Sequence, residues 1–174
     1  MKKFLLVPIV LLAALLPPQL LSQSKPTIAV LTLEAKNVGQ ETADAVADIL
    51  STELFNCQRF KVIERQAIMR ILEEQKLQMT GVTDMGRAVE IGKILNVEKI
   101  LIGSVSRLGE SYIINTRLVD VKTAALEVAQ NVTSKRGEDG LTGAITDLVG
   151  KLSQKVQVEG SIIRIAQKAR AVGI

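Results

Sequence analysis

The chain has 174 residues, enough for one domain, and a formal net charge of +4. Apolar residues make up 47% and aromatic residues only 2%, so any core must be built from Leu, Ile, Val and Ala, and aromatic platforms for stacking nucleic-acid bases are not expected. The sequence contains no histidine and a single cysteine, Cys57. These counts exclude Ser-His-Asp and Cys-His catalytic arrangements, zinc sites built from Cys and His, and an internal disulfide.

Residues 1–24 have the organisation of a secretory signal peptide. Two lysines precede the apolar stretch FLLVPIVLLAALL, and small residues follow, so we predict cleavage after Ser24. The alternative is a retained membrane anchor, which Pro17 and Pro18 disfavour because they interrupt the apolar run. Cleavage would remove two of the basic residues and lower the net charge to +2, so the basic composition is weak evidence for an acidic partner.

The first half of the remaining chain predicts a β-α-β unit. Residues 27–35, TIAVLTLEA, form a nearly continuous apolar run, as expected of a strand covered on both faces. Residues 40–54 carry apolar positions at helical spacing, and residues 59–64, RFKVIE, read as a second strand. This order implies parallel pairing of the two strands with a right-handed crossover.

Two helices and three strands are expected next. One helix follows Glu64 in the segment FKVIERQAIMRILEEQ, and another runs from about residue 85 to 95, capped by Thr83 or Asp84. Three strands joined by short connections predict an antiparallel meander, at residues 98–108, 111–121 and 126–135.

The last predicted helix runs from about residue 140 to 156. The fold class is therefore α/β (α+β): a mixed sheet with the order β-α-β-α-α-β-β-β-α and helices packed on the sheet. In the tail, SIIRIA suggests another strand. Residues 25–157 are then the main domain, and residues 158–174 are either an extra strand or the truncated start of a second domain.

The sequence offers little for catalysis. Neither G-x-G-x-x-G nor a P-loop is present. The remaining candidates are carboxylates at the ends of elements, Glu34, Glu64, Asp84 and Asp120, and nothing in the sequence shows that two of them converge. We expect no enzyme, no cofactor and no metal site; the alternative is a hydrolase with a pair of carboxylates.

Glu64 and Arg65 form an acid–base pair between a predicted strand and a predicted helix. They could be a charged catalytic corner. In the structural interpretation, which we favour, Glu64 lies near the helix N-terminus, where its charge meets the helix dipole. Arg65 then pairs with an acid or lies over the end of the sheet.

The order of the elements resembles the periplasmic domain of the curli-assembly CsgG family, a group that includes LpoB-like activators of penicillin-binding proteins. The resemblance is carried by FKVIERQAIMRILEEQ, by AVEIGKILNVEKILIGSVSRLGESYIINTRLVDVKT and by the final amphipathic helix, and it covers most of residues 27–156. Its most specific pieces are Val62-Ile63-Glu64-Arg65, Gly103-Ser104 and the segment RLVDVKT, which contains Asp120.

The resemblance implies a periplasmic location, protein partners rather than a small substrate, and no catalysis. Glu64, Arg65, Gly103, Ser104 and Asp120 are then structural signatures of the fold. We expect a non-catalytic, outer membrane-associated module of cell-envelope assembly that binds an envelope protein or itself. Nucleic acid is not an expected partner, and the membrane is contacted only through an uncleaved N-terminus. The alternatives are a subunit of an oligomeric outer-membrane secretion or appendage apparatus, or an activator of a penicillin-binding protein.

Three features refine this expectation. Pore-forming members carry long membrane-spanning hairpins and a lipidated N-terminal cysteine, whereas the meander turns here are short, so a pore is disfavoured. The hairpin after Asp120 usually reads T-G-E, and Ala124 stands where the glycine would be, which predicts a strained left-handed alanine. Asn115 and Arg117, on the polar face of the middle meander strand, are candidate interface positions; the alternative is that they are ordinary solvated residues.

Overall fold

The computed structural model describes residues 25–77 and 82–172. The predicted signal peptide, residues 1–24, lies outside the described residues.

The strands of the described chain form one mixed sheet of six. They are β1 (Thr27–Val30), β2 (Glu34–Lys36), β3 (Lys61–Val62), β4 (Lys99–Leu108), β5 (Ser111–Asp120) and β6 (Leu126–Ser134). The order across the sheet is β3-β1-β4-β5-β6, and β2 also pairs with β4. β1 is parallel to β3 and β4, whereas β4, β5 and β6 are antiparallel. The predicted mixed sheet, the parallel pair and the meander are confirmed.

The helices also follow the predicted order. They are α2 (Gln40–Asn56), α3 (Arg65–Glu74), α4 (Met85–Ile94), the short 3₁₀ helix η2 (Gly137–Gly140) and α5 (Leu141–Val172). The N-cap of α4 is Asp84, whose side chain accepts a hydrogen bond of 2.9 Å from the backbone N–H of Arg87. One of the two caps considered from the sequence is thereby selected.

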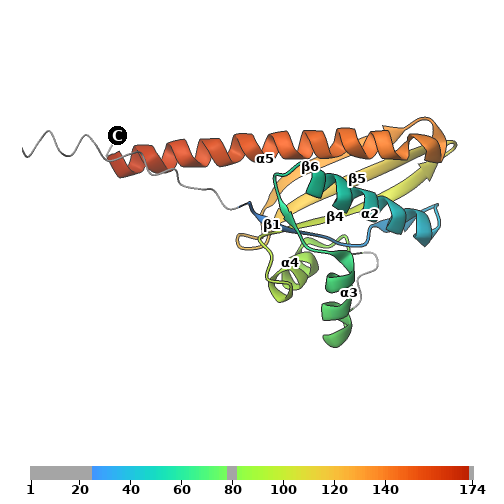
Figure 1. Cartoon of the computed structure of the whole chain (residues 1–174), viewed down its shortest axis with the longest axis horizontal. Coiled ribbons are helices and arrows are strands. Elements are labelled where there is room, and N and C mark those ends of the chain that lie inside the picture. The colour runs from blue at the N-terminus through green and yellow to red at the C-terminus, as the bar shows by residue number, and fades with distance from the viewer. Residues whose placement is uncertain (1–24, 78–81, 173–174) are drawn as a thin grey trace, which may run out of the picture.

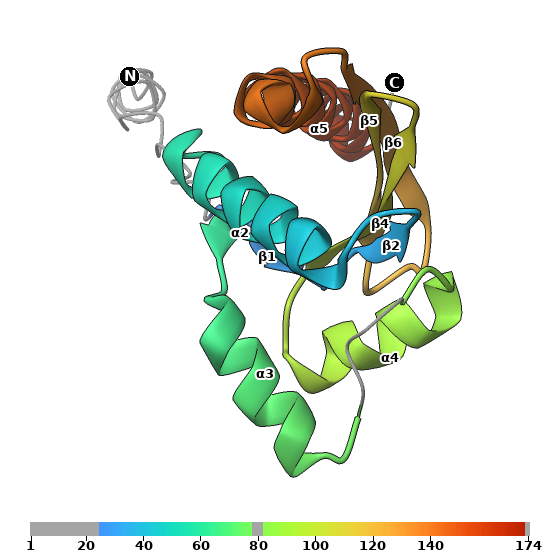
Figure 2. The ribbon, with the colours of Figure 1, turned by 90° about the vertical axis from the view of Figure 1, so that its right-hand side faces the viewer.

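The sheet separates two layers of helices, as Figure 2 shows: α2 and α5 cover one face, and α3 and α4 cover the other. Apolar side chains fill the space on both sides. Between the sheet and the helices α2 and α5 they include Leu50, Ile114 and Ile145. Between the sheet and the helices α3 and α4 they include Ile68, Ile91 and Ile100. Strand β5 has the predicted two faces, because Ile114 and Leu118 are buried against α2 and α5 while Asn115 is exposed.

The apolar run 27–35 does not form the single strand that the sequence predicts. It breaks into β1 and β2, which pair with β4 one after the other. Val30 lies opposite Leu101 and Glu34 lies opposite Ser104, so three residues, 31–33, face two residues of β4. This extra residue has the effect of a β-bulge. After it, the odd-numbered residues face the side of the sheet that the even-numbered residues faced before it.

The tail differs from its prediction. Helix α5 continues to Val172 instead of ending near residue 156, and Figure 1 shows it extending past the end of the sheet. The strand expected at SIIRIA is therefore wrong. A helix that is already nucleated adds residues at little cost, which outweighs the local strand preference of Ile, Ile and Ile. That residues 158–174 begin a further domain stays a prediction.

Ala124 has the predicted left-handed conformation, with a φ of 57°. We expect Ala124→Gly to raise the free energy of unfolding by about 1 kcal/mol, because glycine has no Cβ to strain this turn. Ala125→Gly is the matched control; its φ is not positive, so the change should leave stability unchanged or lower it. Urea unfolding measures both. An Ala124→Gly protein no more stable than the parent would contradict the strained turn.

Candidate functional site

The corner between β3 and α3 is held by Arg65, the first residue of α3. Its Nε lies 2.7 Å from an Asp48 carboxylate oxygen, and its terminal nitrogen lies 3.3 Å from Asp44, both in α2. The same nitrogen approaches the Thr32 hydroxyl at 3.5 Å. Only 13% of the Arg65 side chain is exposed. The arginine thus ties the start of α3 to α2 across the edge of the sheet, which supports the structural interpretation of this pair.

Glu64 is the N-cap residue of α3, and its side chain makes no capping hydrogen bond. It is exposed. A carboxylate at this position is favoured by the helix dipole. Because the side chain makes no hydrogen bond or ion pair within the described part of the chain, its carboxylate is available to a partner.

A groove opens beside this corner, between α2 and α3. It has a volume of about 700 Å³, and Val62 and Ile63 of the sheet edge lie between walls that carry Phe55 of α2 and Met69 of α3. Phe55 is 60% exposed and Met69 is 50% exposed, and both line this one groove, whereas exposed apolar side chains scattered singly over a surface are ordinary. A second hollow of about 390 Å³ shares Phe55 and Val62 with it and is also lined by Lys25 and Lys61. Together these residues form what we call the α2–α3 groove.

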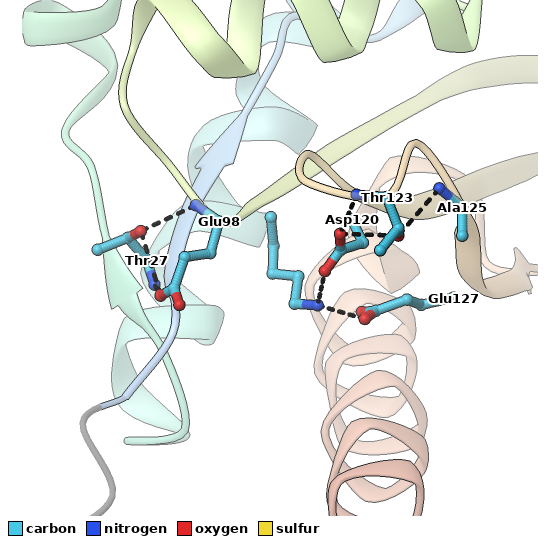
Figure 3. A network of polar contacts seen from close by, with 7 residues as sticks. Thr27, Glu98, Asp120, Thr123, Ala125 and Glu127 are labelled. Carbon is cyan, nitrogen blue, oxygen red and sulfur yellow. Dashed lines mark hydrogen bonds and ion pairs between the residues drawn. The ribbon is translucent and has the colours of Figure 1, made fainter. Parts of the chain in front are cut away.

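A separate polar cluster lies where β4 begins and β5 ends. The Lys99 ammonium donates to Asp120 at 2.6 Å and also to Glu127 of β6 (Figure 3). The three side chains are 13%, 18% and 21% exposed, in that order. Asp120 also accepts hydrogen bonds from the backbone N–H and the hydroxyl of Thr123, at 2.7 and 2.8 Å. The cluster fastens three neighbouring strands together.

This environment shifts two pKa values. Burial alone would raise the pKa of Asp120, but hydrogen bonds from Lys99 and Thr123 outweigh it and lower that pKa from 3.8 to about 2. Burial alone would lower the pKa of Lys99, but Asp120 and Glu127 outweigh it and raise it. Both shifts favour the charged forms, as a structural ion pair requires.

The Asp120 shift predicts acid sensitivity. A carboxyl with a lowered pKa in the folded state stabilises the protein above its unfolded value, near pH 4, and this contribution is lost as the pH falls toward 2. We expect it to amount to up to about 2 kcal/mol. In urea unfolding, the stability difference between the parent and Asp120→Asn should therefore be largest at pH 6 and shrink by pH 2. A difference that does not change with pH would contradict the assignment.

Gly103 and Ser104 lie in the middle of the sheet, not at the groove. A Cβ on Gly103 would come within 2.0 Å of the backbone oxygen of Asn115, so β4 and β5 can approach each other only because residue 103 is glycine. Ser104 is buried beside it. Both residues serve the packing of the sheet.

The two candidate interface positions differ. Asn115 is exposed on the face that bears α3 and α4. Arg117 is half-buried, and its guanidinium donates a hydrogen bond of 2.9 Å to the backbone oxygen of Thr83, just before α4. Arg117 therefore has an internal role in holding α4 against the sheet, and Asn115 remains the freer of the two.

The structure does not bring the sequence-selected residues into one site. Glu64 and Arg65 border the α2–α3 groove, whereas the other signature residues and the candidate interface residues lie in β4 and β5. Within residues 25–77 and 82–172, no three acidic or cysteine side chains could hold a metal ion together. No helix in the same ranges has both the length and the apolar character needed to cross a membrane.

Sequence reasoning missed Phe55 and Met69. A signal was available: both are large apolar residues next to, but not on, the apolar stripes of their helices, which run through Leu50 and Leu54 in α2 and through Ile68 and Leu72 in α3. An apolar side chain off the buried stripe is expected to face solvent or a partner.

A family described as "Curli production assembly/transport component CsgG" matches residues 16–112, more than half of the chain. No curated protein matches.

Solved structures share the fold. The LpoB C-terminal domain from Escherichia coli is 15% identical, with a TM-score of 0.54, over 64% of this chain and 83% of that chain. Lipoprotein GNA1162 from Neisseria meningitidis is also 15% identical, with a TM-score of 0.56, over 81% of this chain and 96% of that chain. At this level of identity the likeness shows a common fold.

Proposed function

The chain belongs to the CsgG family, and from that premise we propose that it is a non-catalytic protein-interaction module of the cell envelope, acting in the periplasm. The observation that carries the proposal is the α2–α3 groove, in which Phe55 and Met69 stay exposed beside a corner fixed by Arg65. Exposed apolar side chains gathered in a rigid groove are typical of a protein-binding surface. The family membership supports an envelope role, and the signal-peptide pattern supports export.

Crosslinking in the producing cells tests the proposal. The photo-crosslinking residue p-benzoylphenylalanine is placed at position 55 or 69 in the full chain, with position 90 as the control, because Glu90 is exposed on α4, away from the groove. We expect the same adduct from positions 55 and 69 and none from position 90. The absence of an adduct from the groove, or an equal adduct from position 90, would contradict the proposal.

The identity of the adduct distinguishes the finer alternatives. A penicillin-binding protein would indicate an activator of cell-wall synthesis, as the LpoB-like fold leads us to consider. Adducts between copies of the chain would indicate a subunit of an oligomeric apparatus. Another envelope protein would support the module as proposed. Protease accessibility in spheroplasts, compared with that in lysed cells, tests the periplasmic location of the same tagged chain.

A further inference from the structure

We propose that the α2–α3 groove receives an extended segment of the partner protein, which adds to the free edge of β3 as a further strand. This inference rests on the proposed function and specifies the chemistry of the partner. The segment presents apolar side chains to Phe55 and Met69, an acidic side chain toward Lys61 and a basic side chain toward Glu64.

The first argument is the edge itself. In the part of the chain that the structure describes, β3 is the last strand of the sheet and pairs only with β1. The N–H groups of Lys61 and Ile63 donate to Pro26 and Ile28, at 2.9 Å each. Because backbone groups alternate in direction along a strand, the N–H and C=O of Val62 point away from β1. They form an open place for a strand to pair.

The open edge continues past Val62 to Glu64, two residues further along the chain. Glu64 keeps an extended backbone, with φ −63° and ψ 137°, so its N–H points the same way as that of Val62. Its C=O is already used, because it accepts from Ile68 in the first turn of α3. A partner strand is therefore offered two donors and one acceptor, and Val62 lines both hollows of the groove.

The second argument is what flanks the edge. Val62 lines both hollows of the groove, and the exposed Phe55 lines both as well. A partner helix placed here would use its backbone hydrogen bonds internally. It would then cover the N–H and C=O of Val62 and leave them buried without a hydrogen-bond partner. An extended segment pairs with them and also sends alternate side chains to the apolar walls. Because α2 and α3 stand on either side of the edge, a single segment reaches it more easily than the sheet of a second folded copy.

The third argument is charge. Lys61 and Lys25 lie at one end of the groove, and Glu64 lies at the other. Within the described ranges neither Lys61 nor Glu64 takes part in an ion pair, whereas Asp48 and Asp44 share the charge of Arg65. Charges of opposite sign at the two ends select a segment of complementary sequence and fix its register.

The test removes the outward N–H of Val62. Proline is tolerated at an edge position whose N–H faces solvent, so Val62→Pro should keep the pairing with β1 and block the partner strand. Val62→Ala is the matched control, since it also shortens the side chain but keeps the N–H. With p-benzoylphenylalanine at position 55, we expect the adduct yield to fall at least tenfold in Val62→Pro relative to Val62→Ala, with both variants folded by circular dichroism.

Three results would overturn the inference: equal yields from the two variants, a crosslinked partner peptide that lies in a helix, or an adduct only to a second copy of the chain. If Val62→Pro does not fold, amide exchange of the parent chain bound to the captured partner replaces it. The Val62 and Glu64 amides should then exchange at least tenfold more slowly than in the free chain, and unchanged exchange would overturn the inference. Adducts that form but survive the proline change contradict this inference alone, whereas no adduct at all contradicts the proposed function as well.

Discussion

Replacing Gly103 by alanine is expected to lower the free energy of unfolding by about 3 kcal/mol or more, the largest loss we expect from a single methyl group in this protein. The added Cβ would lie 2.0 Å from the backbone oxygen of Asn115 and 3.1 Å from the Cα of Thr116. Both obstacles are backbone atoms of β5, so no side-chain rotation relieves the clash. The two strands must separate in the middle of a ladder that runs without a break from Lys99 to Leu108.

Gly143→Ala in α5 is the matched control for this prediction. No heavy atom outside its own helix lies within 4 Å of the position that its Cβ would take. Alanine is also the better helix former, so this change should raise stability by about 0.5–1 kcal/mol. Urea unfolding of the two variants should give shifts of opposite sign. A Gly103→Ala protein as stable as the parent would show that β4 and β5 are not as close as described.

Lys99→Met is expected to lower the free energy of unfolding by about 2 kcal/mol at pH 7. Methionine keeps most of the volume but removes the cation between Asp120 and Glu127, and so leaves two carboxylates close together with their neutralising partner gone. Removing one partner of a fully buried pair costs more, but about a fifth of each carboxylate side chain here is exposed to water. Adding Asp120→Asn to the variant should restore part of the loss, because only one charge then remains.

Lys151→Met tests whether the loss comes from burial rather than from losing any ion pair. Lys151 pairs with Asp147 at 2.6 Å, but about half of each side chain is exposed. Surface pairs of this kind contribute little, so we expect a change within about 0.5 kcal/mol. Chemical denaturation at pH 7 measures both variants. Equal losses would show that the Lys99 cluster has no special role.

The sequence was sufficient for the elements that bury one face. Helix α2 was predicted from apolar residues at helical spacing, and the same residues, such as Val46 and Leu50, are fully buried. The meander was predicted from three strands with short connections, and the buried side of β5 follows the predicted alternation. In these elements, one periodic pattern determines both the type of structure and its orientation.

The sequence was not sufficient where both faces are buried. Residues 27–35 carry apolar side chains on both faces of the sheet, so their sequence does not alternate. The pattern therefore cannot reveal that one extra residue is inserted at 31–33. The tail differs from its prediction for another reason: the strand preference of SIIRIA is local, whereas the helix that contains it begins twenty residues earlier. Both errors come from effects that local composition does not record.

The candidate site was predicted only in part. Arg65 was expected to pair with an acid, and it pairs with two. The partners of Lys99 depend on the pairing register of β4, β5 and β6, which side-chain patterns alone do not give. The groove was missed because it arises from two helices on opposite faces that meet at the edge of the sheet. Phe55 and Met69 are fourteen residues apart and become neighbours only in the folded chain.

Helix α5, the last element that the structure describes, closes the core on its face of the sheet. Leu141, Ile145, Leu148 and Leu152 pack with α2 and with the strands that precede them. A chain that emerges N-terminus first, from a ribosome or through a membrane, therefore exposes the apolar underside of α2 and of β4–β6 until residues 141–152 follow. The α3–α4 side needs only residues already present by Val121 and can pack earlier. This face of the core is therefore completed only after α5 has emerged, and until then its apolar surface is open to holding chaperones.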